Sequence, residues 1–314
     1  MQILSENLKW QLAHLPNLPG GYLRKNRQGT GLYIGLLNFL LVAILFCTAP
    51  LYATETLPIV VTLPVLKDLV EKVGRQHVVV TSLITGLESE HTYTPRPSDV
   101  IAIKNSKMLV KIGLGLETWI DSLIKNADRK NLLTITTSKD VPLMKDGNPH
   151  IWLDPTLAKI MTHHIARGLS QIDPLRQEVY QHNQASFALA LDALTEEMIA
   201  RVAKIQNRKI ITHHPAWPYF AKRFGFIIAG EIQMQAGSEP SAKQMGALTR
   251  LMRREKIGVI LSEPQLNPKM PQILFEETGA KIVILSPMPL SKTNDYIDFI
   301  RYNVETLVRA LQRS

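Results

Sequence analysis

Three histidines in this sequence lie close to prolines, in segments whose composition suits a metal site. His91 belongs to the segment E-H-T-Y-T-P-R-P, His150 to N-P-H-I-W-L-D-P, and His214 to H-H-P-A-W. Proline fixes its own φ angle and disfavours helix in the residue before it, so each imidazole is expected on a stiff loop. Imidazole nitrogen is a common ligand of Zn²⁺ and related metals. A single loop histidine is ordinarily a solvated side chain, so the prediction of a metal site requires the fold to bring the three together.

Two carboxylates accompany these histidines. Glu90 directly precedes His91, and Glu263 begins the segment E-P-Q just after a β-branched run. Either could complete the tetrahedral ligand set that zinc prefers, with water as the other possibility. Two further histidines, His163 and His164, fall inside a predicted helix, and we interpret them as exposed or packed helix residues.

Short β-branched runs alternate with helical patterns along the chain after residue 56, which predicts an α/β fold with parallel sheets covered on both faces. The predicted strands are 57–62, 78–84, 108–112, 132–135, 209–212, 226–229, 258–262 and 281–285. The predicted helices are 64–73, 98–106, 119–126, one beginning at 156, 219–224, 242–254, 269–277 and 295–311.

The histidines fall where such a fold binds ligands. In open parallel sheets, ligands lie beyond the carboxyl ends of the strands. His91, His150, His214 and Glu263 are all in predicted loops, and the last two directly follow strands. Ser98 and Asp99 have the composition of an N-cap for the helix predicted after the His91 loop.

One long helix is predicted between the two halves of the chain. After Pro174 there is no proline or glycine as far as Ile205, and apolar residues recur at near-helical spacing. A helix of about thirty residues would be about 45 Å long, which is more than a crossover between neighbouring strands needs. We therefore predict an N-terminal α/β lobe at 54–172, a linking helix at 173–206 and a C-terminal α/β lobe at 207–314.

The first 53 residues have the pattern of an export signal. Residues 31–49 are apolar and uncharged, Lys25 and Arg27 precede them, and small or helix-breaking residues lead to Ala53. This predicts a signal peptide cleaved after Ala53. A retained membrane anchor is the alternative, because the apolar run approaches the length that spans a bilayer. A lipoprotein attached through Cys47 is disfavoured by the bulky residue before it. Each alternative exports residues 54–314.

Composition narrows the classes of function further. Cys47 is the sole cysteine, so the exported part has no disulfide framework, no cysteine zinc finger and no cysteine nucleophile. The formal net charge of +9 falls to +6 without residues 1–53, and the remaining basic residues are scattered. Nucleic-acid binding would require them to cluster in a stripe. The sequence contains no H-E-x-x-H, G-x-S-x-G or phosphate-binding P-loop motif, so a ready-made enzymatic interpretation lacks support.

Several motifs, taken in order, resemble a known family across about residues 57–312. They are H-T-Y-T-P-R-P-S-D from 91, G-L-G-L-E-T-W from 113, N-P-H-I-W-L-D-P from 148, T-H-H-P-A-W-P-Y-F-A-K-R-F-G from 212, G-S-E-P-S-A-K from 237 and S-E-P-Q-L-N-P-K from 262. The family is that of the metal-binding solute-binding proteins of zinc and manganese ABC importers (TroA-like, cluster 9). The resemblance implies two α/β lobes joined by one long helix, with metal in the cleft between them. It also implies a periplasmic receptor that delivers its metal to an ABC permease in the inner membrane.

Carried over by position, the resemblance assigns roles to individual residues. His91, His150 and His214 match the family's three imidazole ligands, and a histidine rather than a glutamate at the third position favours zinc. Many members have an aspartate as fourth ligand where this chain has Ser286, so the resemblance leaves Glu90 as the candidate fourth ligand. Glu263 is expected to orient a histidine. The histidine-rich loop of many zinc receptors is absent from residues 131–148.

Three alternatives remain open from the sequence. The first is a manganese receptor of the same family. The second is a zinc-dependent hydrolase, in which Glu263 or Glu90 would act as general base toward a metal-bound water. The third is an adhesin or zinc-buffering protein that has the same site but no transporter.

Overall fold

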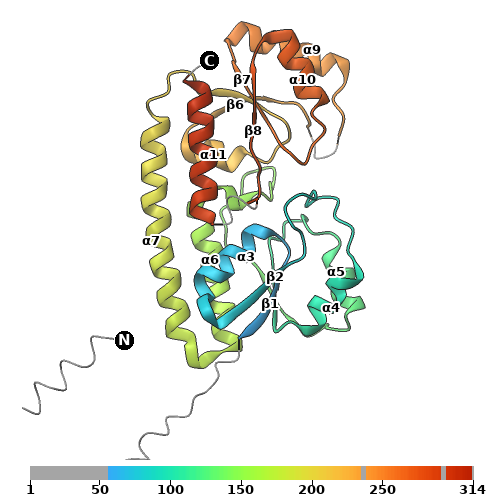
Figure 1. Cartoon of the computed structure of the whole chain (residues 1–314), viewed down its shortest axis with the longest axis vertical. Helices are drawn as coiled ribbons and strands as arrows, with labels where there is room; N and C mark the ends of the chain where they lie inside the picture. The colour runs from blue at the N-terminus through green and yellow to red at the C-terminus, as the bar shows by residue number, and fades with distance from the viewer. Residues whose placement is uncertain (1–55, 235–237, 291–294, 313–314) are drawn as a thin grey trace, which may run out of the picture. The chain divides into compact units, whose positions relative to one another are not determined.

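Two parallel four-stranded sheets, each flanked by helices, make up the described part of the chain (Figure 1). The computed structural model describes residues 56–234, 238–290 and 295–312. The predicted α/β class with two lobes and a long connecting helix is therefore confirmed. The signal peptide or anchor predicted at 1–53 lies outside the described residues.

The first sheet has the strand order β2-β1-β3-β4, and all its neighbouring strands are parallel. Its central strand β1 carries Ile59, Val60 and Val61, which are buried because helices cover both faces. The strands are β1 (Leu57–Val61), β2 (Val78–Ser82), β3 (Met108–Lys111) and β4 (Leu133–Thr136). The helices between them are α3 (Pro64–Gly74), α4 (Pro97–Asn105) and α5 (Ile120–Asn126), with a 3₁₀ turn η1 (Arg75–His77).

The second sheet repeats this topology with the order β6-β5-β7-β8, again parallel throughout. Gly225 and Gly279 end two of its helices in the left-handed conformation, which glycine adopts without a Cβ clash. The strands are β5 (Lys209–Thr212), β6 (Ile227–Glu231), β7 (Val259–Ser262) and β8 (Lys281–Ile284). The helices are α8 (Pro218–Phe224), α9 (Ala242–Glu255) and α10 (Lys269–Thr278).

Long helices connect the two sheets. The connecting helix α7 (Gln177–Val202) has 26 residues, so it is about 39 Å long rather than the predicted 45 Å. It is shorter because Pro174 begins a separate 3₁₀ turn, η3 (Pro174–Arg176), and α6 (Pro155–Ile172) ends before it. The C-terminal helix α11 (Tyr296–Leu311) lies beside α7 (Figure 1) and packs against α7 and α3. The domain boundaries at 172 and 206 stay predictions.

The two sheets share a core. One cluster of buried residues includes Val61 of the first sheet, Leu191 of α7, Leu261 of the second sheet and Phe299 of α11. A smaller cluster around Ile260 and Met252 fills the space between the second sheet, α9 and α10. The strands of both sheets therefore pack on one continuous hydrophobic core.

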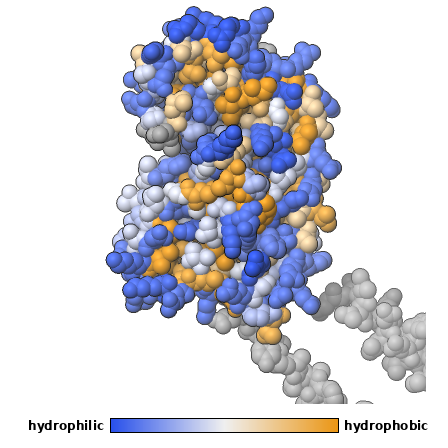
Figure 2. Space-filling view, turned by 180° about the vertical axis from the view of Figure 1, so that it is seen from behind, coloured by the Kyte–Doolittle hydropathy of each residue, from blue (hydrophilic) through white to orange (hydrophobic). Residues whose placement is uncertain are grey.

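The surface mixes polar and apolar residues. On the face in Figure 2, hydrophobic patches are interspersed with hydrophilic residues. Within residues 56–234, 238–290 and 295–312, no helix combines the length and the apolar composition needed to cross a bilayer.

Asp68 joins α3 to the start of α11. Its carboxylate accepts a hydrogen bond of 2.9 Å from the main-chain nitrogen of Tyr296, next to the ion pair of Lys72 with Asp295. Burial raises the pKa of Asp68 to about 6, although the Tyr296 hydrogen bond and the Lys72 charge act in the opposite direction. A carboxyl group with a raised pKa stabilises the fold most when it is protonated.

We expect the Asp68→Asn variant of the metal-free protein to be more stable than the wild type at pH 8 by about 1–3 kcal/mol. The wild type loses the contribution of protonated Asp68 as the pH rises from about 4 through 6, whereas asparagine does not ionise. The difference should therefore vanish toward pH 4. Urea unfolding at several pH values measures it, with Asp121→Asn at an exposed position as control. An equal pH dependence of stability in both proteins would contradict the expectation.

Candidate metal site

Glu90, His91, His150 and His214 come together at the carboxyl ends of the strands. Each offers one ligand atom, and the four atoms all lie within 4.8 Å of one another. The Nε2 atoms of His91 and His150 are 3.3 Å apart, and His150 Nε2 is 3.4 Å from Glu90 Oε1. Zinc bound tetrahedrally at 2.0–2.1 Å separates its ligand atoms by about 3.3–3.4 Å. The pair His91 Nε2 and Glu90 Oε1 is wider, at 3.9 Å.

Two atoms of this cluster lack hydrogen-bond partners. Glu90 Oε1 and His214 Nε2 are both buried and both unpaired. Buried polar atoms without partners are rare and destabilising in folded proteins. A cation shared by the four side chains would satisfy both atoms, so the donor set fits a divalent metal.

Solvent reaches one side of the cluster. The side chains of His150, His214 and Glu90 are 2%, 4% and 4% exposed, while that of His91 is 24% exposed. His91 therefore forms the outer wall of the cluster, and the other three form its floor.

Asn148 orients His150. Its Oδ1 atom is 2.9 Å from His150 Nδ1 and also accepts the main-chain N–H of His150 at 3.0 Å. The hydrogen on Nδ1 leaves the lone pair of Nε2 facing the cluster. The Asn148 amide nitrogen donates to the carbonyl of Pro215 at 2.6 Å, so one side chain links the loops of His150 and His214. Asn148 belongs to the motif N-P-H-I-W-L-D-P, and its role follows from these contacts and not from the sequence.

Glu263 orients His214. Its Oε1 atom lies 2.7 Å from His214 Nδ1 and accepts a second hydrogen bond of 3.0 Å from Trp217 Nε1. His214 follows β5 and Glu263 follows β7, which are neighbours in the second sheet, and this pairing brings the two side chains together. Glu263 lies outside the group of four that converges on one point. Trp217 is a further contributor, with no role predicted from the sequence.

The loop that carries Glu90 and His91 is supported from behind by Tyr93. Its hydroxyl lies 2.8 Å from Asp99 Oδ2 and 3.1 Å from the carbonyl of Leu83, and its ring packs edge-on against Trp119 with centroids 5.0 Å apart. These contacts fix the chain two residues after His91.

The predicted N-cap of the following helix was wrong. Helix α4 begins at Pro97 with Arg96 as its N-cap, because proline fits the first helical position without losing a hydrogen bond. Asp99 sits three residues after the cap and accepts the Arg96 N–H at 2.7 Å.

The charges of the cluster suit a divalent cation. Burial lowers the pKa of His91, and the neighbouring His150 and His214 act in the same direction against the charge of Glu90, so the pKa falls to about 4. Burial also lowers the pKa of His150. For His214, burial acts in the same direction, but the charge and hydrogen bond of Glu263 outweigh it and raise the pKa.

Glu90 remains ionised in this setting. Burial acts to raise its pKa, but the contact with His150 and the charges of His150 and His91 lower it to about 2. An ionised carboxylate and neutral imidazoles are the forms that bind metal, so Glu90, His91 and His150 are held in the binding form, whereas His214 must lose a proton when it binds.

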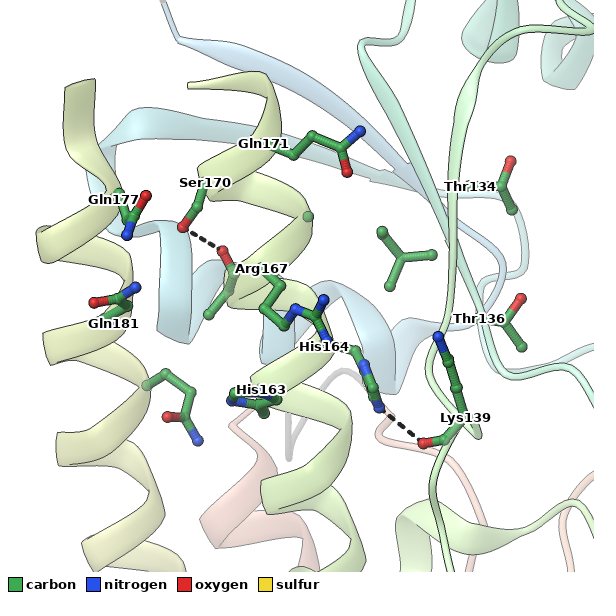
Figure 3. A pocket seen from close by; sticks show the side chains of 14 residues that line it. Thr134, Thr136, Lys139, His163, His164, Arg167, Ser170, Gln171, Gln177 and Gln181 are labelled. Atoms are coloured by element: carbon green, nitrogen blue, oxygen red, sulfur yellow. Dashed lines mark hydrogen bonds between the residues drawn. The ribbon is translucent and has the colours of Figure 1, made fainter. Parts of the chain in front are cut away.

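A larger cavity of about 880 Å³ lies away from the cluster, between β4, α6 and α7 (Figure 3). His163 is exposed, and the ring of His164 turns toward Lys139, where its Nε2 atom is 2.8 Å from the main-chain oxygen. Among the described residues, neither histidine belongs to a group of three or more potential metal ligands. Both are therefore exposed or packed helix residues, as expected.

Comparison with known proteins assigns the family. The family described as "Zinc-uptake complex component A periplasmic" (ZnuA) matches residues 59–310. The chain belongs to this family. The "High-affinity zinc uptake system protein ZnuA" of Brucella abortus is 26% identical over 291 residues, covering 77% of this chain and 87% of the relative.

Solved structures of the same kind superimpose on this member of the zinc-uptake component A family. A crystal structure of ZnuA has a TM-score of 0.75 at 28% identity and covers 82% of this chain and 100% of that one. FpvC from Pseudomonas aeruginosa, solved with Mn²⁺, has a TM-score of 0.74 at 26% identity, with coverage of 82% and 99%. The resemblance to zinc and manganese solute-binding proteins is thus confirmed.

Ser286 and the segment G-L-G-L-E-T-W of this zinc-uptake family member lie outside the group of potential ligands. Ser286, at the expected aspartate position, accepts hydrogen bonds from Gln265 Nε2 at 3.0 Å and Met288 N at 3.1 Å. In G-L-G-L-E-T-W, the buried Glu117 accepts hydrogen bonds from the side chain of Thr62 and from two main-chain nitrogens at the end of β3. The turn needs Gly113, whose φ is +90° and whose added Cβ would lie 2.5 Å from the Thr136 side chain.

Proposed function

We propose that the exported protein captures Zn²⁺ with His91, His150, His214 and Glu90 and delivers it to an ABC permease in the inner membrane. The observation that carries this proposal is the convergence of four donor atoms within 4.8 Å, two of them buried and unpaired. Membership of a family described as a periplasmic zinc-uptake component supports the cargo and the location.

The donor chemistry favours zinc over manganese. Three imidazoles and one carboxylate form a nitrogen-rich set, whereas Mn²⁺ prefers oxygen ligands. The two ligand spacings of 3.3 and 3.4 Å are those of a small tetrahedral site. A related structure with Mn²⁺ shows that the family fold also accommodates that metal, so manganese is the competing cargo.

Titration of zinc into purified residues 54–314, stripped of metal with a chelator, tests the proposal. We expect about one equivalent to bind with submicromolar affinity, and we expect manganese to compete poorly. Binding weaker than micromolar, or manganese displacing zinc at equal concentration, would contradict it.

The delivery step is tested by growth under zinc limitation, where loss of the gene should impair zinc uptake and the wild-type gene should restore it.

Glu90 is the proposed fourth ligand. Its unpaired Oε1 atom lies within the group of four, whereas Ser286 is engaged with Gln265 and Met288. X-ray absorption of the zinc-loaded protein should show three imidazole nitrogens and one carboxylate oxygen. Zinc affinity that is unchanged in Glu90→Ala would assign the fourth position to water instead.

A zinc-dependent hydrolase has less support. The cavity at the cluster is about 190 Å³, below the 300–1,000 Å³ range typical of organic ligands. Glu263 already accepts two N–H groups through Oε1 and is placed to orient His214 rather than to activate a water. The size and lining of the cavity favour an ion as the bound species.

A further inference from the structure

Gln265 connects the two halves of the protein at the rim of the metal site. It lies two residues after Glu263, and its amide nitrogen donates to the main-chain oxygen of Gly86 at 2.7 Å and to Ser286 Oγ at 3.0 Å. The side chain lines the same cavity of about 190 Å³ as Glu90, His91 and His214. Gln265 therefore reaches from the second half to the loop that carries two of the four ligands.

That loop, residues 85–92, is pressed against the second half at Gly86. The φ angle of Gly86 is +98°, and a Cβ added there would lie 3.0 Å from the carbonyl oxygen of Pro289. Other hydrogen bonds of the loop stay within the first half: Thr85 donates to Glu88, and the main-chain nitrogen of His91 lies 3.3 Å from Ser89 Oγ. Arg96 also donates to Glu88, at 3.1 Å, and His91 Nε2 lies 3.3 Å from His150 Nε2. Hydrogen bonds within the first half fix the shape of this loop but not its distance from the second half.

The other two ligands are fixed to each other across the halves. Asn148 donates to the carbonyl of Pro215 beside His214, and Trp152 Nε1 donates to the carbonyl of Pro287 at 2.6 Å. Both His150 and His214 are almost fully buried. The ligand set thus has a fixed pair, His150 and His214, and a pair on the loop at 85–92.

We propose that Gln265 is a positioning residue, which holds the 85–92 loop across the site and thereby sets the rate at which the bound metal leaves. This inference rests on the proposed function for the nature of the cargo. Release requires His91 and Glu90 to move away from the fixed pair, and that movement breaks the hydrogen bond between Gln265 and Gly86. Loss of one hydrogen bond, here a partly buried one, changes an equilibrium or rate by up to about tenfold.

Two measurements on the Gln265→Leu variant test the proposal. We expect zinc release into excess chelator, followed by stopped flow, to be about tenfold faster than in the wild type. In the metal-free protein, we expect faster hydrogen exchange at amides of residues 85–92 and unchanged exchange in α6. Gln265→Met, which keeps the length of the side chain, loses the donor and adds no charge, should behave like Gln265→Leu. Gln272→Leu on α10, where the native amide donates to Glu276 on its own helix, is the matched control and should leave both readouts unchanged.

The outcomes separate this proposal from the function it rests on. If the wild type does not bind zinc, the proposed function is overturned. Hydrogen exchange at the amides of residues 85–92 in the metal-free variants would still show whether Gln265 holds the loop. If the wild type binds zinc but either release or loop exchange is unchanged in both Gln265 variants, the positioning role of Gln265 is overturned. Faster release together with faster loop exchange, absent from the Gln272→Leu control, supports it.

Discussion

Replacing His150 with alanine is expected to weaken zinc binding by at least about a hundredfold. Changes to residues that only orient a ligand typically cost 10–100-fold in metal affinity, and removal of a ligand should cost no less than the upper end of that range. His150 is the most buried of the three imidazoles, and its Nε2 atom lies within 3.4 Å of both the His91 Nε2 and the Glu90 Oε1 atoms. Competition with a fluorescent chelator measures the affinity.

The matched control is His163→Ala, because His163 is an exposed histidine on α6 outside the group of four. Its zinc affinity should equal that of the wild type. His214→Ala provides a second variant from the other half of the protein, should His150→Ala fail to fold by circular dichroism. Less than tenfold weakening in both ligand variants would place the zinc site elsewhere.

Zinc should raise the melting temperature of the metal-free protein by about 8–16 °C when it is present at a thousand times its dissociation constant. Ligand binding to the folded state at that concentration contributes about 4.1 kcal/mol, and 1 kcal/mol shifts the melting temperature of a protein of this size by about 2–4 °C. The ion would also satisfy the buried Glu90 Oε1 and His214 Nε2 atoms, one from each half of the chain. Differential scanning calorimetry measures the shift.

Excess chelator should reverse the increase in melting temperature, and His150→Ala at the same zinc concentration should show little of it. His163→Ala again serves as the control and should match the wild type. An equal increase in the His150→Ala and wild-type proteins would mean that zinc stabilises the fold from another site.

The sequence was sufficient for features that depend on local pattern. The strand at 209–212 has the predicted bounds, and the positions of His214 and Glu263 after β5 and β7 follow from the rule that parallel strands end at one edge of a sheet. Glycines at 225 and 279 marked the ends of α8 and α10 because only a residue without a Cβ adopts the left-handed conformation freely.

Contacts between residues far apart in the sequence could not be predicted from the local pattern of residue types. The hydrogen bond from Asn148 to Pro215 joins residues 67 positions apart, and that from Gln265 to Gly86 joins residues 179 apart. Amide side chains pair with any main-chain carbonyl within reach, so their partners are decided by packing rather than by neighbouring residue types. The resemblance to metal receptors supplied the candidate ligands and the expected orienting role of Glu263, whereas the contacts of Asn148 and Trp217 came from the fold.

The core that runs from the first sheet through α7 and α11 to the second sheet limits how far the two halves can rotate against each other. A hinge between the halves would expose side chains such as Leu191 and Phe299, and burial of such groups stabilises the fold by about 1.5–3 kcal/mol each. Large rotations of one half against the other are therefore costly. We therefore expect the metal-loaded and metal-free proteins to differ in the side chains around the site rather than in the relative orientation of the two halves.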